Sequence, residues 1–154
     1  MKKISKETFS LIIIIIGVLA TFTIFLPALA SPNDGTTFTG FDIVFGTEFA
    51  NFGSWVSGNI RASIFGILAY ALPIVGVIVT VVMKKGEMIA ILLFAISAVL
   101  LFVMPSYIST TVTILGTVTE IDIDWVFAYG LISAQVLTVL GVMVLLMKTV
   151  KYPN

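Results

Sequence analysis

Hydrophobic residues fall into four long runs along the chain, and the segments between them mix polar and apolar positions. The runs cover residues 9–30, 62–83, 88–104 and 125–147. A helix rises about 1.5 Å per residue and needs about 20 apolar residues to cross a hydrocarbon layer of about 30 Å. The pattern therefore predicts an all-α membrane protein, a four-transmembrane-helix bundle in one membrane domain.

The end of the first run has a second interpretation. A basic start, an apolar stretch and the sequence LPALA before Ser31 are typical of a secretory signal with cleavage after Ala30. The run is longer than the roughly 7–15 residues of a signal-peptide core. We therefore favour an uncleaved first helix and keep cleavage as the alternative.

Charge distribution along the chain predicts the orientation. Seven of the eight basic residues lie on one side of a four-span arrangement, and only Arg61 lies on the other. Acidic residues gather in the two remaining loops, 31–61 and 105–124. Basic residues mark the cytoplasmic side. We expect a multi-pass protein of the cell (inner or plasma) membrane with both termini in the cytoplasm.

Composition supports a membrane protein. Hydrophobic residues make up 59% of the chain, charged residues 10%, and the mean hydropathy is +1.18. Soluble domains carry about 25% charged residues.

The outer loops are not featureless. Alternation over residues 37–45 predicts a strand, and apolar positions three or four apart predict a short interfacial helix over 47–57 with Thr47 as its N-cap. The second outer loop contains another strand candidate. A lone hairpin is marginal in water, so we expect strands of both loops to pair into a small extracytoplasmic β element.

Three carboxylates in the second loop could hold a cation. Glu120, Asp122 and Asp124 share one face of an extended strand. Alternate residues of a strand are nearly 7 Å apart, whereas Ca²⁺ needs about six to eight close oxygens. We predict an acidic rim without metal, which Asp42 and Glu48 of the first loop share, with Asp124 capping the last helix, and keep the cation site as the alternative.

Aromatic residues of the first loop form the candidate interaction surface. They could line a contact with a partner, or form an interfacial belt that packs the loop onto the helix ends. The two interpretations are compatible. The residues are Phe38, Phe41, Phe45, Phe49, Phe52 and Trp55.

Small and polar residues within the runs are candidates for helix packing. Small side chains allow helices to approach closely, and a mid-span proline favours a kink. We favour packing within this chain, with self-association through Gly130 and Ala134 as the alternative. The candidates are Gly66, Pro73, Gly130, Ala134 and Gln135.

Several kinds of chemistry lack their residues. The chain has no cysteine and no histidine, which excludes thiol and imidazole catalysis and Cys/His zinc sites. The predicted spans contain no Asp, Glu, Lys, Arg or His, which disfavours ion-coupled transport. We also find no nucleotide-binding loop and no basic patch for nucleic acid. The prediction is a non-enzymatic protein without a cofactor or nucleic-acid partner.

The outline resembles the claudin-like tetraspan proteins in its four spans, internal termini and long first outer loop. The family pattern W…GLW…C…C is not present, since this loop has only Trp55, no GLW and no cysteine. No functional residue can therefore be transferred. The resemblance implies an interaction module that uses its outer sheet.

We predict a protein that acts by association, as a scaffold or accessory subunit of a membrane complex, through its extracytoplasmic loops. Its partners would be the lipid bilayer and a membrane protein or further copies of itself. Two alternatives stay open: an oligomeric pore or channel with an acidic outer mouth, and an envelope sensor or immunity-type protein.

Overall fold

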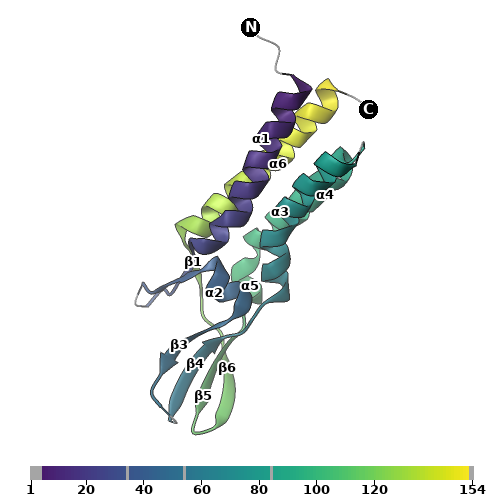
Figure 1. Cartoon of the computed structure of the whole chain (residues 1–154). Coiled ribbons are helices and arrows are strands. Elements are labelled where there is room, and N and C mark those ends of the chain that lie inside the picture. Colours follow the sequence, from purple (N-terminus) through teal and green to yellow (C-terminus); the bar gives the residue numbers. More distant parts are fainter. Residues whose placement is uncertain (1–4, 34, 54, 84, 153–154) are drawn as a thin grey trace.

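Four long helices pack side by side, and a group of strands extends beyond one end of them (Figure 1). The computed structural model describes residues 5–33, 35–53, 55–83 and 85–152. Both α1 and α4 pack against α3 and α6, so the four helices form a closed ring. Their bounds are α1 (Lys6–Phe22), α3 (Ile64–Val82), α4 (Glu87–Phe102) and α6 (Tyr129–Lys151).

The fold is mixed, so the prediction of an all-α four-helix bundle was wrong. The part of the chain that the structure describes holds six α-helices and two antiparallel sheets, with 61% helix and 20% strand. The hydrophobic runs located the long helices. They said little about the loops, whose strands gain their stability from pairing with residues far away in sequence.

The first run shows the same error at its end. It was predicted as one helix over 9–30, but α1 ends at Phe22, a 3₁₀ turn covers Thr23–Phe25, and Pro27–Ala30 forms strand β1. Leu26 is extended, as expected for a residue before proline.

Among the described residues, three helices are long and apolar enough to cross a membrane. They cover Lys6–Phe25, Ile64–Val82 and Tyr129–Lys151. The fourth, α4, has 16 residues, about 24 Å at 1.5 Å per residue, and is shorter than the predicted span 88–104. A short helix, α5 (Met104–Tyr107), follows it and contains Pro105 at its start.

Sheet A joins the helices to the outer part of the molecule. Its strand order is β2 (Thr37–Thr39), β1, β7 (Val126–Phe127), all antiparallel. Central strand β1 packs against α6 and buries Ala28 and Leu29 completely. Ala30 is the last residue of β1, so a cut after it would leave sheet A without its central strand.

Sheet B contains strands from both outer loops and points away from the helices (Figure 1). Its central pair, β4 with β5, runs from Val56↔Ile114 to Ile60↔Thr110. The two loops therefore pair as predicted, but not through the predicted strand 37–45. The strand order is β3 (Thr47–Asn51), β4 (Val56–Ile60), β5 (Thr110–Ile114) and β6 (Thr117–Ile121).

The first outer loop reverses the predicted order of strand and helix. The segment predicted as a strand, 37–45, continues after β2 into helix α2 (Gly40–Phe45), and the segment predicted as a helix, 47–57, forms β3 and the start of β4. A capping box starts α2: the Thr39 side chain accepts from the Asp42 N–H at 3.1 Å, and the Asp42 carboxylate accepts from the Thr39 N–H at 2.9 Å. Gly46, at φ 83°, ends α2.

Two clusters of buried side chains make the core. The larger one joins sheet A, α2 and the ends of the long helices, and includes Leu29, Tyr70 and Leu131. The smaller one lies between the helices around Phe94, which is fully buried. A side chain at Gly76 would lie 2.9 Å from the Phe94 ring, so the glycine makes room for it.

Candidate functional site

Strand β6 is the most open element of the outer part. All five of its residues, Thr117–Ile121, are exposed. In the part of the chain that the structure describes, β6 pairs only with β5, so its other side is a free sheet edge. A free edge presents backbone N–H and C=O groups that can accept a further strand.

The tips of the two hairpins of sheet B lie side by side. The Leu115 N–H donates to the Trp55 carbonyl at 2.9 Å. Large apolar side chains at these tips are strongly exposed: Phe52 by 72%, Trp55 by 68%, Leu115 by 69% and Ile114 by 51%. We call these four residues the sheet B tip.

No charged residue accompanies the tip. Residues 49–59 and 111–119 contain no Asp, Glu, Lys or Arg. The outer part of sheet B is therefore an uncharged surface that ends in exposed apolar side chains.

The predicted aromatic interaction surface divides into three groups. Phe38 is buried against Trp125, with ring centroids 5.5 Å apart, and Phe49 packs beside Phe38 at 6.2 Å. These two rings belong to the core. Phe52 and Trp55 belong to the sheet B tip, and the remaining two belong to a separate cluster on α2.

That cluster forms an exposed row of rings at the end of α1. Centroid distances along the row are 6.1, 6.1 and 4.5 Å. Aromatic rings at the ends of apolar helices are typical of a membrane–water interface. We call this row the aromatic belt; it consists of Phe22, Phe25, Phe41 and Phe45.

The three carboxylates of the second outer loop do not converge. Glu120 accepts from Arg61 at 2.9 Å, with both side chains exposed. Asp122 and Asp124 line a separate cleft of about 370 Å³ beside Trp125. Among the described residues, no group of three or more His, Cys, Asp or Glu side chains could hold a metal ion.

Two acidic residues have different positions from those predicted. Asp124 was predicted to cap the last helix, but α6 begins at Tyr129 with Ala128 at its N-cap. Asp42 was assigned to the acidic rim, but its carboxylate belongs to the capping box of α2. The strand β7 lies between Asp124 and α6, which the sequence pattern did not reveal.

The predicted packing residues make contacts within the chain. A side chain at Gly130 would lie 2.5 Å from the Pro27 carbonyl, so α6 approaches the start of β1 here. Gly66 faces Val44 of α2, and Pro73 lies inside α3. Ala134 is fully buried one turn from Gly130 on α6.

Several polar side chains among the helices are bonded within the chain, although the Tyr70 hydroxyl is buried without a hydrogen bond to any described residue. Gln135 donates to the Leu101 carbonyl at 3.2 Å, and Ser97 donates to the Ala69 carbonyl at 2.6 Å. Beyond α4, Tyr107 donates to the Leu100 carbonyl at 3.1 Å, and burial raises the pKa of its hydroxyl above the ordinary value. These bonds explain how the polar groups tolerate burial.

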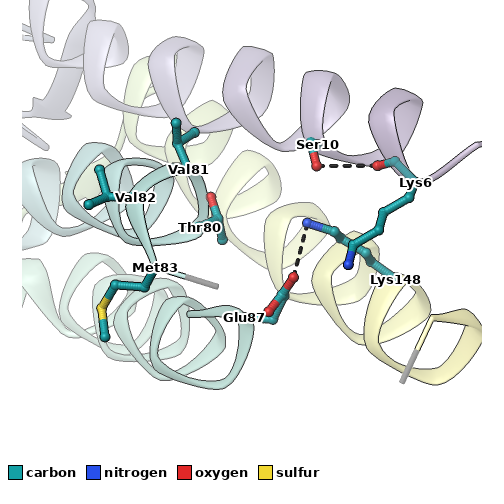
Figure 2. Close-up of a pocket in the computed structure, with 8 residues that line it drawn as sticks. All are labelled: Lys6, Ser10, Thr80, Val81, Val82, Met83, Glu87 and Lys148. Atoms are coloured by element: carbon teal, nitrogen blue, oxygen red, sulfur yellow. Dashed lines mark hydrogen bonds and ion pairs between the residues drawn. The ribbon is translucent and has the colours of Figure 1, made fainter. Parts of the chain in front are cut away.

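An ion pair that the sequence did not predict lies at the opposite end of the helices. The Lys148 Nζ is 3.2 Å from the Glu87 carboxylate, and only 3% and 7% of the two side chains are exposed. Figure 2 shows the pair beside Lys6, in a cleft of about 450 Å³. Glu87 is in the first turn of α4 and Lys148 in the last turn of α6, where each charge is favoured by its helix dipole.

The sequence alone does not reveal this pair, because the two residues are far apart along the chain. Both flank apolar runs, where charged residues are expected at the membrane surface. The available signal was that an acid precedes the third apolar run and a base follows the fourth, so the two charges lie at the same end of neighbouring helices.

No protein-family model, curated protein or solved structure matches this chain. The resemblance to claudin-like proteins therefore stays a prediction from the outline of the sequence.

Proposed function

We propose that this chain is a non-enzymatic integral membrane protein that acts by association through sheet B, as a scaffold or accessory subunit of a membrane complex. The observation that carries the proposal is the free edge at β6, which is exposed along its whole length. A strand from another protein can extend such an edge by main-chain hydrogen bonds.

Charge supports the orientation of this protein in the membrane. The start of α1 and the end of α6 lie at one end of the helices, and sheet B lies beyond the other (Figure 1). Lys6, Lys148 and Lys151 belong to the first end, and Arg61 with the outer acids belongs to the second. By the positive-inside rule, both termini are cytoplasmic and sheet B is outside.

The long helices are the proposed membrane spans. We infer that α1, α3 and α6 cross the cell membrane, and that α4 returns the chain through the same layer from the cytoplasmic end of α3 to sheet B. The aromatic belt would then lie at the outer surface of this membrane.

A partner that pairs with β6 would be a membrane protein with an outer strand of its own, or a second copy of this chain. The turn between β5 and β6 has two residues, so Ile114 and Thr117 close it as a hydrogen-bonded pair. Alternation along an antiparallel ladder then directs the Val118 N–H away from β5, toward the free edge.

Photocrosslinking in native membranes tests the proposal. A photoreactive side chain at Thr119 should give a discrete adduct that mass spectrometry can identify. Val118→Pro removes the edge N–H and should abolish the adduct, whereas the matched control Val118→Thr keeps the N–H and should preserve it. An adduct that survives Val118→Pro, or no adduct at all, would contradict association through β6.

A further inference from the structure

The sheet B tip exposes more apolar surface than the fold requires. Its four side chains are each at least half exposed, although they lie at the ends of two paired hairpins, β3–β4 with an irregularity between Glu48 and Ala50 and β5–β6 in continuous register. A fully buried aromatic side chain covers about 150–250 Å², so the tip exposes roughly 500 Å² of apolar surface. Patches of this size on soluble surfaces are often contact sites.

Leu115 gives an independent reason to assign a role to the tip. It has φ +49°, and Gly116 after it has φ +83°. A two-residue turn of this type favours Asn, Asp or Gly at its first position, because other side chains are strained there. Leucine is therefore unfavourable here for two reasons: its backbone conformation is strained, and 69% of this apolar residue is exposed.

The tip is well separated from the aromatic belt. Strand β4 runs from Ile60, which is buried at the base of the sheet, to Val56 near the tip. Four residues of extended chain span about 13 Å. Sheet B points away from the helices along this direction (Figure 1). The tip and the belt therefore do not share one membrane surface.

We propose that the sheet B tip inserts into the interfacial layer of a lipid bilayer other than the one that holds the helices. This inference rests on the proposed location of sheet B outside the cell membrane. The tip would let the protein bridge two membranes, or a membrane and a lipid-covered surface.

Shape and size favour lipid over a protein as the occupant. The apolar side chains project from adjoining turns, so a protein partner would need a matching concave pocket. Stable protein interfaces bury about 800 Å² on each partner, more than the tip exposes. A bilayer interface adapts to a projecting group, and Trp and other aromatic rings are favoured in it.

Charge narrows the class of lipid. The tip has no basic residue that could bind an anionic headgroup, and the nearest base at the foot of the sheet, Arg61, is paired with Glu120. Glu48 would be repelled by an anionic surface. The proposed occupant is therefore a zwitterionic bilayer, and binding should depend little on salt.

The test uses the full chain in lipid nanodiscs mixed with phosphatidylcholine vesicles. Trp55 is exposed and Trp125 is buried, so a blue shift of the tryptophan emission reports on the tip. We expect a blue shift, quenching by brominated phosphatidylcholine, and flotation of the nanodiscs with the vesicles. Vesicles that contain phosphatidylglycerol should bind no better. A need for anionic lipid, or no quenching, would overturn the proposal.

Leu115→Asn separates binding from folding. Asparagine suits the turn, so the unfolding temperature should stay the same or rise, while vesicle binding should fall at least tenfold. Val126→Thr also removes an exposed apolar side chain, but from strand β7 of sheet A, and should keep binding. Equal binding by Leu115→Asn and the unsubstituted chain would overturn the proposal.

Two further outcomes have defined meanings. Binding only to vesicles that carry the same protein would identify a second copy as the occupant and overturn the lipid proposal. The β6 adduct distinguishes this inference from the proposed function: loss of vesicle binding with an intact adduct refutes only the lipid contact. Loss of the adduct with intact vesicle binding refutes only the association through β6.

Discussion

Two ion pairs, one at each end of the molecule, show how differently its two halves are built. The Arg61–Glu120 pair at sheet B is shorter, at 2.9 Å against 3.2 Å for Lys148–Glu87, but its side chains are 54% and 67% exposed. The pair among the helices is almost completely buried. Water screens the attraction between the two exposed charges, so the first pair adds little to stability. The buried charges are not screened, so removing one of them is costly for the other. The N···O distance alone would wrongly rank the exposed pair as the more important one for stability.

The same difference extends to the rest of each half. Several polar groups among the helices bond to neighbours within the chain, as Gln135 and Ser97 do. Sheet B leaves a strand edge and an apolar tip open to the surroundings. Changes in the helical half should therefore alter stability, and changes in sheet B should alter contacts with other molecules.

The largest effect is expected at the buried ion pair. Lys148→Met should lower the free energy of unfolding by about 3–5 kcal/mol, because it leaves the Glu87 carboxylate buried without this partner. Denaturant unfolding of the detergent-solubilised protein measures this. The double variant Glu87→Met/Lys148→Met removes both charges and should recover most of the loss. A double variant as unstable as the single one would show that the pair is not the cause.

Gly130→Leu should have the next largest effect. The new side chain would meet the Pro27 carbonyl, and overpacking of this kind lowers the free energy of unfolding by about 1–3 kcal/mol. Val139→Leu is the control, because Val139 is 40% exposed on the same helix. Thermal unfolding in detergent compares the two, and equal losses would refute the close approach of α6 to β1.

The two acids of the first outer loop should differ from one another. Asp42→Ala removes half of the capping box and should lower the free energy of unfolding by about 1 kcal/mol. Glu48→Ala changes an exposed residue of β3 and should stay within about 0.5 kcal/mol. Denaturant unfolding of both variants checks this, and a larger loss for Glu48→Ala would contradict the cap.

Only a small effect is expected at the exposed ion pair. Arg61→Gln should change the free energy of unfolding by about 0–1 kcal/mol, because both charges are well solvated. The difference should disappear near 1 M salt, where the Debye length is about 3 Å. A loss of unfolding free energy as large as that of Lys148→Met would contradict the difference proposed between the two halves.

The first outer loop explains why sequence patterns succeeded in one half and failed in the other. Phe45, Phe49 and Phe52 have helical spacing, yet Phe49 lies on strand β3. Its ring covers Gly58 of the neighbouring strand β4. Over so few residues, a helical period and a hairpin contact give similar patterns. The Thr39–Asp42 capping box was present in the sequence and was the better local signal.

The candidate sites were predicted only in part. Phe52 and Trp55 were assigned to an interaction surface and are exposed, but Phe38 and Phe49 from the same group pack in the interior. Leu115 was not predicted because its significance lies in a backbone angle and in its position beside Trp55. Neither property is visible before the hairpins are paired.

The sequence by itself determined the long apolar helices and the separation of charge between their two ends, because helix length and hydropathy are properties of contiguous residues. The short strands of sheets A and B, the burial of Lys148 with Glu87, and the free edge at β6 were decided only by the tertiary structure. Each depends on segments far apart in sequence, and pairing between them provides the hydrogen bonds and burial that a single segment lacks.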